Sequence, residues 1–163
     1  MANEKELKQA KSVFDTICRM MDKNELRYNK DEEKFIISCV LHGDDIPMDM
    51  IFAVRPEAQV VSLLSPMPFK MPEDKRVEGA VATSMASYGL VNGYFDFDMN
   101  DGEIRFRMVS SYHESILGEN LFEYMLMVSA HTIDEYNDRF LMLAKGMWNI
   151  EQFIEWENNR RGE

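Results

Sequence analysis

The sequence predicts an α+β domain in which helices pack on one antiparallel sheet. Two kinds of periodicity indicate this class. Consecutive segments with apolar residues at every second position are joined by short, turn-rich links, which favours an antiparallel meander. Helix-type spacing appears at both ends of the chain and once in between, rather than after every strand. The 163 residues suit one domain, expected over 1–163 with a core at about 5–155.

The N-terminal segment, residues 4–22, is predicted to be an amphipathic helix. Its apolar residues recur at spacings of three and four, which places them on one face. A helix that binds in a partner's groove would show the same stripe, but packing on the domain's own sheet is the favoured interpretation. The stripe consists of Leu7, Ala10, Phe14, Ile17 and Met21.

Two well-marked strands and two shorter ones follow this helix. Residues 35–41 and 48–54 alternate strictly, and residues 26–28 and 59–64 have weaker strand character. The predicted core positions of the two marked strands are Phe35, Ile37, Cys39, Leu41, Met48, Met50, Phe52 and Val54.

A loop and a second helix are predicted next. Residues 65–72 contain three prolines, which cannot continue a central strand. Pro72 is suited to the first position of a helix that runs to Tyr88, with Gly89 as its C-cap. Five residues give this helix a moderately apolar face, and a second set is small enough to allow close packing. The apolar set is Val77, Val81, Ser84, Met85 and Tyr88, and the small set is Gly79, Ala80, Ala82, Ala86 and Ser87.

The remaining third predicts a β-hairpin and two helices. Residues 93–98 and 103–108 alternate around the turn 99–102. Their common outer face has Asp on one strand and Arg on the other, so cross-strand pairs would help to fix the register. A long helix is predicted from 119 to about 145, where Gly146 ends it. Asn149 and Gln152 form a capping box for a final helix.

The charge of the chain excludes several classes of partner. It has 29 acidic and 18 basic residues, a net charge of −11, which argues against binding to nucleic acid or to an anionic membrane. Cys18 and Cys39 are expected to be small buried hydrophobes rather than a disulfide framework or a zinc site. A charged start without a signal-peptide core, and no apolar run near 20 residues, lead us to expect a cytoplasmic protein.

No catalytic, cofactor-binding or metal-ligating residue is predicted. The three histidines show no metal-site spacing. The run Asp96-x-Asp98-x-Asn100 resembles the start of a calcium loop, but Asp101 and Arg107 stand where the loop needs Gly and Glu. The chain is therefore not expected to be an enzyme, although an enzyme whose site is assembled from distant residues stays a third hypothesis.

The stretch Ala86-Ser-Tyr-Gly-Leu-Val-Asn-Gly-Tyr-Phe-Asp-Phe-Asp-Met-Asn-Asp-Gly-Glu-Ile-Arg-Phe-Arg107 joins a helix end, a strand and an Asp-Gly turn. Together with the long helix ending at Lys145-Gly146 and the order of the elements, it resembles the YbjN family. That family has a fold like that of type III secretion chaperones. The resemblance implies a bacterial cytoplasmic protein, often described as a sensory transduction regulator, with chaperone-like protein binding and homodimers. The family pattern contains no catalytic residues.

The leading functional hypothesis is a non-enzymatic module of a bacterial cytoplasm that binds a protein partner, as a chaperone or a regulator. The alternative is a small-molecule or signal sensor with a pocket between the sheet and helix 72–88. Of the 14 methionines, five fall in loops or off the predicted core stripes. These are candidates for an adaptable binding surface, which predicts that they gather on one face: Met20, Met67, Met71, Met99 and Met127.

Overall fold

The computed structural model describes residues 1–162, in which six strands form one antiparallel sheet. The strand order is β1-β2-β3-β4-β6-β5, a meander that ends in a hairpin. This confirms the predicted α+β class. The strands are β1 (Asn29–Asp31), β2 (Ile36–Leu41), β3 (Met48–Arg55), β4 (Val60–Lys70), β5 (Tyr94–Phe97) and β6 (Glu103–Ser111).

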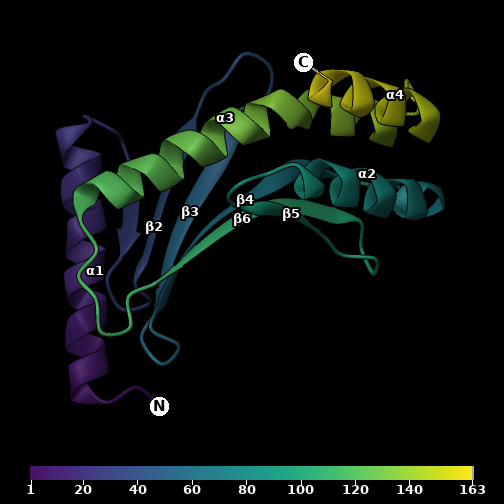
Figure 1. Cartoon of the computed structure of the whole chain (residues 1–163). Coiled ribbons are helices and arrows are strands. Elements are labelled where there is room, and N and C mark those ends of the chain that lie inside the picture. The colour runs from purple at the N-terminus through teal and green to yellow at the C-terminus, as the bar shows by residue number, and fades with distance from the viewer. Residues whose placement is uncertain (163) are drawn as a thin grey trace.

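Four α-helices and one short 3-10 helix lie on the same side of this sheet (Figure 1). Helix α1 runs alongside the strands, α3 crosses above them, α2 lies over β5, and α4 lies on the far side of α2 from β5 (Figure 1). The helices are α1 (Glu4–Lys23), η1 (Glu73–Lys75), α2 (Arg76–Tyr88), α3 (Glu119–Ala144) and α4 (Ile150–Arg161).

The core fills the space between the sheet and helices α1 and α3. The alternating residues predicted for β3 are all buried, as are Ile37 and Cys39 of β2. Phe52 meets Phe122 of α3 edge to face at 6.1 Å between ring centroids. The capping box at Asn149 is present as predicted. The strand expected at 26–28 is wrong in its bounds, because β1 spans Asn29–Asp31 and shares no residue with that range.

The loop predicted over 65–72 is wrong for most of its length, because β4 continues to Lys70. The prolines are tolerated because β3 pairs with β4 only as far as Leu64, and beyond that residue β4 has one partner, β6. The β4–β6 register also shifts between Pro66 and Lys70. Proline is accepted at such edges and irregularities, since no neighbouring strand needs its missing N–H.

Helix α2 presents its small residues, rather than its larger apolar ones, to the rest of the domain. Gly79, Ala82, Thr83 and Ala86 are buried, whereas the predicted apolar face is mainly exposed. An added Cβ at Gly79 would lie 2.7 Å from carbon atoms of both Met71 and Phe97. The close packing predicted from the small residues is therefore confirmed. Among the larger residues, Val77, Val81 and Tyr88 are exposed to 69%, 39% and 86%.

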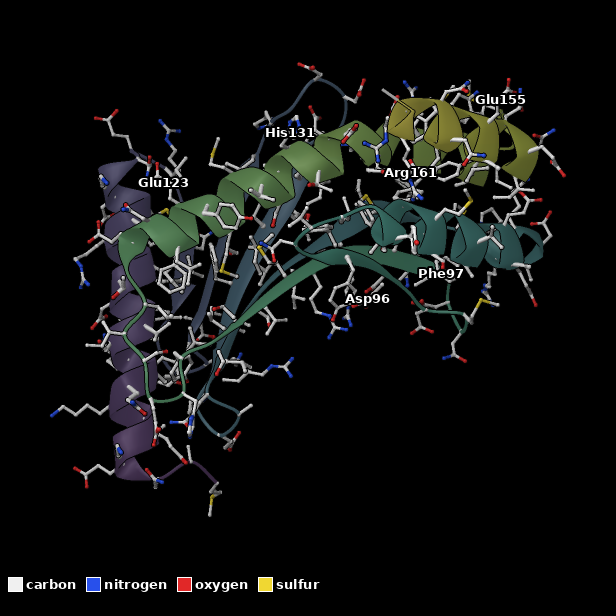
Figure 2. The ribbon with its side chains drawn as sticks, in the orientation of Figure 1. Asp96, Phe97, Glu123, His131, Glu155 and Arg161 are labelled. Atoms are coloured by element: carbon white, nitrogen blue, oxygen red, sulfur yellow. The ribbon has the colours of Figure 1, made fainter. Side chains whose placement is uncertain are left out.

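Helix α4 is fastened to α2 and α3 by a buried carboxylate. Glu157 is completely buried and accepts hydrogen bonds from Arg160, Arg161 and Tyr136. Arg161, seen between α2 and α4 in Figure 2, also donates to the carbonyl oxygen of Met85 near the end of α2. A buried charge requires such partners, because desolvation disfavours it otherwise.

Candidate functional site

The side of the sheet that carries no helix is the main candidate for a functional surface. We call it the outer face, and it lies on the inner side of the bend that β4, β5 and β6 describe (Figure 1). Several of its side chains are apolar although no helix covers them. Its apolar and small residues are Ile36, Ser38, Val40, Ile51, Ala53, Val60, Ser62, Leu64, Tyr94 and Val109, and the same register also places Asp49, Arg55, Asp96, Arg105, Arg107 and Ser111 on it.

The register places these residues in two rows across the strands. One row runs from Ser38 through Ile51 and Leu64 to Arg107 and Tyr94. The other runs from Ile36 through Ala53 and Ser62 to Val109. Side chains in neighbouring strands of a row lie within contact distance. The two rows therefore form a band with an apolar centre at Ile36, Ile51, Ala53 and Leu64, which also contains Ser38, Ser62 and Arg107.

Some aliphatic and aromatic side chains of the outer face are exposed to solvent. Within the rows, Val109 is 45% exposed and Tyr94 39%, and Val40, which lies beside the band opposite Asp49, is 51% exposed. The central residues Ile51 and Leu64 are half-buried by their neighbours in the sheet. An exposed apolar patch on a folded domain is typical of an interaction surface.

Arginines stand at the β5–β6 end of the band. The Asp96 carboxylate accepts from Arg105 Nε at 2.9 Å and from Arg107 Nη2 at 3.0 Å. The Arg107 guanidinium also lies over the Tyr94 ring, 5.0 Å from its centroid. Figure 2 shows Asp96 on the side of β5 away from the helices. The predicted Asp–Arg pairing across the hairpin is thus confirmed, with one aspartate shared by two arginines.

A hollow of about 600 Å³ opens at the opposite end of the outer face. It begins beside β1 and reaches the middle of β3, so it continues the apolar band toward the sheet edge. Its lining is Arg27, Tyr28, Asn29, Ser38, Cys39, Val40, Asp49 and Ile51.

The free edge of β5 is occupied by a side chain of α2. The Phe95 backbone N–H donates to Ser87 Oγ at 2.8 Å, and the Ser87 hydroxyl donates to the Phe95 carbonyl at 3.4 Å. Both backbone groups that Phe95 directs away from β6 are therefore satisfied. Such cover is one way in which proteins protect an exposed strand edge.

The methionines proposed for binding do not gather on this surface. Met20, Met67 and Met71 are buried to 93% or more, at 0%, 7% and 1% exposure, so the exposed position predicted for them is wrong. Met20 is buried because α1 contacts α3 as well as the sheet, and Met67 and Met71 are buried because β4 continues where a loop was expected. Met99 in the hairpin turn and Met127 on α3 are exposed, at 49% and 61%.

Met127 borders a separate hollow of about 350 Å³ between α3 and the β2–β3 link. Leu41, Met48 and Ala130 give it an apolar lining, and His131 stands at its side. Asp134 accepts from the Asp44 backbone N–H at 3.0 Å and so fastens the link to α3. The hollow is small, and Met99 is not among its lining residues.

Two other kinds of site have no support in residues 1–162. No grouping of three or more His, Cys, Asp or Glu side chains there has the geometry to hold a metal ion. The sensor hypothesis places a pocket between the sheet and α2, where the structure shows close packing around Gly79.

Within residues 1–162, no helix is long and apolar enough to cross a bilayer.

The outer face was not predicted from the sequence, although the sequence holds a signal for it. Apolar pairs in the strands place one side chain on each face of the sheet, since successive residues point in opposite directions. A sheet with apolar residues on both faces is expected to be covered on both sides. The pairs are Ile36–Ile37, Ile51–Phe52, Val60–Val61 and Leu63–Leu64.

The fold is that of YbjN and of type III secretion chaperones. The chain is similar to YbjN, a proposed transcription regulator from E. coli, with a TM-score of 0.56 and 10% identity over 77% of this chain and 92% of that one. It is similar to a chain of the ExsC–ExsE complex, with a TM-score of 0.56 and 13% identity over 77% and 91%. The HopA1–SchA chaperone–effector complex gives a TM-score of 0.50 and 9% identity over 78% and 95%. No family model and no curated protein matches the sequence.

Proposed function

We propose that this chain is a non-enzymatic protein-binding module of the bacterial cytoplasm, which holds a protein partner on the outer face. The observation that carries the proposal is the band with its apolar centre on a sheet face that no described helix covers. Two similar chains come from complexes with protein partners, one of them named as a chaperone with its effector. A chaperone-like or regulatory role agrees with both facts.

The composition of the outer face supports a protein partner. Arg105, Arg107 and Tyr94 flank aliphatic residues, and no lysine lies within the band. Protein–protein interfaces are enriched in arginine and tyrosine and depleted in lysine. Ile51, Leu64 and Val109 occupy outward positions that an ordinary solvated sheet face would fill with polar residues.

We also propose that the chain forms a homodimer through α2. Val77, Val81 and Tyr88 make an exposed apolar line along this helix. If two copies pair their α2 helices antiparallel, Glu73 and Asp74 before the helix approach the Arg161 that lies over Tyr88 of the second copy. This pairing of opposite charges favours a second copy at this line.

The sensor hypothesis has less support than protein binding. It needs an open pocket beside α2, and carbon atoms of Phe97 and Met71 already fill the space next to Gly79. The two hollows on the outer face and at Met127 are open depressions suited to side chains of a partner.

Affinity purification from the native cell, with two exposed outer-face residues altered, tests the proposed function. Val40→Glu and Val109→Glu should each lose the partner that co-purifies with the wild type, because a buried charge without a partner is costly. Val91→Glu is the matched control, since Val91 is 97% exposed and lies in the link between α2 and β5. Retention of the same partner by all three variants would contradict the proposal.

A further inference from the structure

The link between α2 and β5 contains a reactive pair of residues, Asn92 and Gly93. Asn92 is the only asparagine that is followed by glycine in the 163 residues. We propose that Asn92 is a site of spontaneous deamidation in the folded chain, where the Gly93 backbone nitrogen attacks the Asn92 side chain. The reaction takes water as its only co-reactant, and it is independent of the protein partner proposed for the outer face.

The reaction converts the side-chain amide into a carboxylate in two steps. In the first, the Gly93 nitrogen forms a bond to Cγ of Asn92 and gives up its proton, while the Cγ–Nδ2 bond breaks and Nδ2 leaves as ammonia. The product is a five-membered succinimide ring. In the second, water adds to either ring carbonyl and the C–N bond at that carbon breaks, which gives aspartate or isoaspartate. One water is consumed, one ammonia is released, and no oxidant or reductant takes part.

The backbone of the link leaves the attacking nitrogen free. Within the part of the chain that the structure describes, the N–H groups of Asn92 and Gly93 have no hydrogen-bond acceptor. Gly93 has a φ of 76°, in the left-handed region that favours glycine, and its missing side chain leaves its nitrogen unhindered. Val91, just before the pair, is 97% exposed. The link is therefore open to solvent and held by few contacts, which favours local motion.

The Asn92 side chain makes one hydrogen bond, and that bond leaves the attacked atom open. Its Nδ2 donates to the Tyr124 hydroxyl of α3 at 2.7 Å. In residues 1–162 this side chain makes no other hydrogen bond, and Asn92 is exposed. The carbonyl oxygen and Cγ are therefore accessible to the Gly93 nitrogen and to water.

The hairpin turn contains a second step of this kind, which the structure protects. Aspartate followed by glycine forms the same ring with loss of water, so the sequence alone gives Asp101–Gly102 as a further candidate. There the Gly102 N–H donates to the Asp98 carbonyl oxygen at 2.8 Å. The Asp101 carboxylate accepts from the Glu103 N–H at 3.0 Å and pairs with Lys70. Because both reacting groups are engaged, we expect this step to stay unchanged in the folded domain.

Deamidation adds one negative charge to the net charge of −11 and alters the contact with α3. A carboxylate only accepts hydrogen bonds, whereas a tyrosine hydroxyl both donates and accepts. In the aspartate product, the Tyr124 hydroxyl therefore becomes the donor. In the isoaspartate product, the main chain of the link is one carbon longer. Since the Phe95 N–H of β5 donates to Ser87 of α2 at 2.8 Å, the ends of the link stay in place and the exposed link takes up the extra atom.

Timed incubation of the purified full chain in mildly alkaline buffer tests this inference. Peptide mapping by mass spectrometry should show that Asn92 loses its amide at least tenfold faster than any other asparagine, and that it gives both aspartate and isoaspartate. Ion exchange should show a more acidic species that elutes with the Asn92→Asp variant. That species should never form from Asn92→Gln, because glutamine would have to close a larger ring. Asn92→Asp should unfold at the same urea concentration as the wild type.

Incubation in urea separates the effect of the fold from that of the sequence. Asp101 should form isoaspartate at least tenfold faster in the unfolded chain than in the folded chain, whereas Asn92 should react in both. The inference is overturned if Asn92 keeps its amide in the folded chain, or if it reacts only in urea. It is also overturned if Asp101 isomerises as fast as Asn92 reacts in the folded chain, or if the acidic species forms from Asn92→Gln.

Discussion

The Tyr136 hydroxyl donates a hydrogen bond to the Glu157 carboxylate at 2.9 Å, and both side chains are completely buried. The contact joins α3 to α4. Burial, and then the neighbouring Glu157 carboxylate, raise the pKa of Tyr136, so the phenol stays protonated as a donor. Arg161 Nε completes the arrangement 2.7 Å from the same carboxylate. The position of α4 therefore depends on one buried charge.

Replacing that charge should destabilise the domain more than removing one of its donors. Glu157→Gln removes the buried negative charge that Arg160 and Arg161 face and replaces one acceptor oxygen with an NH2 donor, and it should lower the free energy of unfolding by about 3 kcal/mol. Tyr136→Phe removes one hydrogen bond to a charged group and should cost about 1.5–3 kcal/mol. Urea unfolding measures both. Equal stability of Glu157→Gln and the wild type would show that the network does not hold α4.

A methyl group added to Gly79 should also be destabilising. In an exposed helix, Gly→Ala stabilises by about 0.5–1 kcal/mol. Here the new Cβ would meet Met71 and Phe97 at 2.7 Å, and overpacking costs about 1–3 kcal/mol. Ser84→Ala, at an exposed position of the same helix, is the control and should change little. A Gly79→Ala variant more stable than the wild type would contradict the packing of α2 described above.

The Cys39 thiol should make stability fall in alkaline solution. Burial raises the pKa of Cys39 from its ordinary value of 9.0 to about 11. Because the folded state holds this proton more tightly, its contribution is complete below pH 9 and is lost as the pH rises toward 11, amounting to about 2 kcal/mol by pH ~10.5. Denaturant unfolding at pH 8 and 10.5 should show a smaller drop for Cys39→Ala than for the wild type. An equal drop in both proteins would contradict this origin.

Self-association should depend on α2 and not on the outer face. Light scattering of the wild type should give about twice the chain mass of 19.1 kDa. Val81→Glu places a charge in the middle of the exposed line and should give the mass of one chain, whereas Val40→Glu should keep the dimer. A wild type that stays at the mass of one chain across the concentration range would refute the dimer.

The sequence predicted those elements whose signals are local. The period of two in β3, the capping box at Asn149 and the Asp-Gly turn of the hairpin each depend on neighbouring residues, and each is present. The extension of β4 to Lys70 depends instead on the neighbouring strand β3, because β3 stops pairing with β4 at Leu64. Nothing in the residues around Pro66 carries that information.

The orientation of α2 and the binding surface were harder to predict for the same reason. Hydrophobicity favoured burying Val77 and Val81, but close approach to Phe97 favours small residues at the contact, so the small side faces inward. The methionine hypothesis relied on distance from a stripe, and Met20 is off the stripe yet buried because α3 covers α1. The apolar pairs in the strands hold more information about the outer face than the methionines do.

Photo-crosslinking from Val109 tests the central claim most directly. A photoreactive amino acid placed at Val109, 45% exposed on the outer face, should crosslink the native partner in the living cell. The same group at Met147, 64% exposed in the link before α4, should not. A partner captured from Val109 and absent from Met147 is the result that we predict. A partner captured from Met147 and never from Val109 would contradict binding at the outer face.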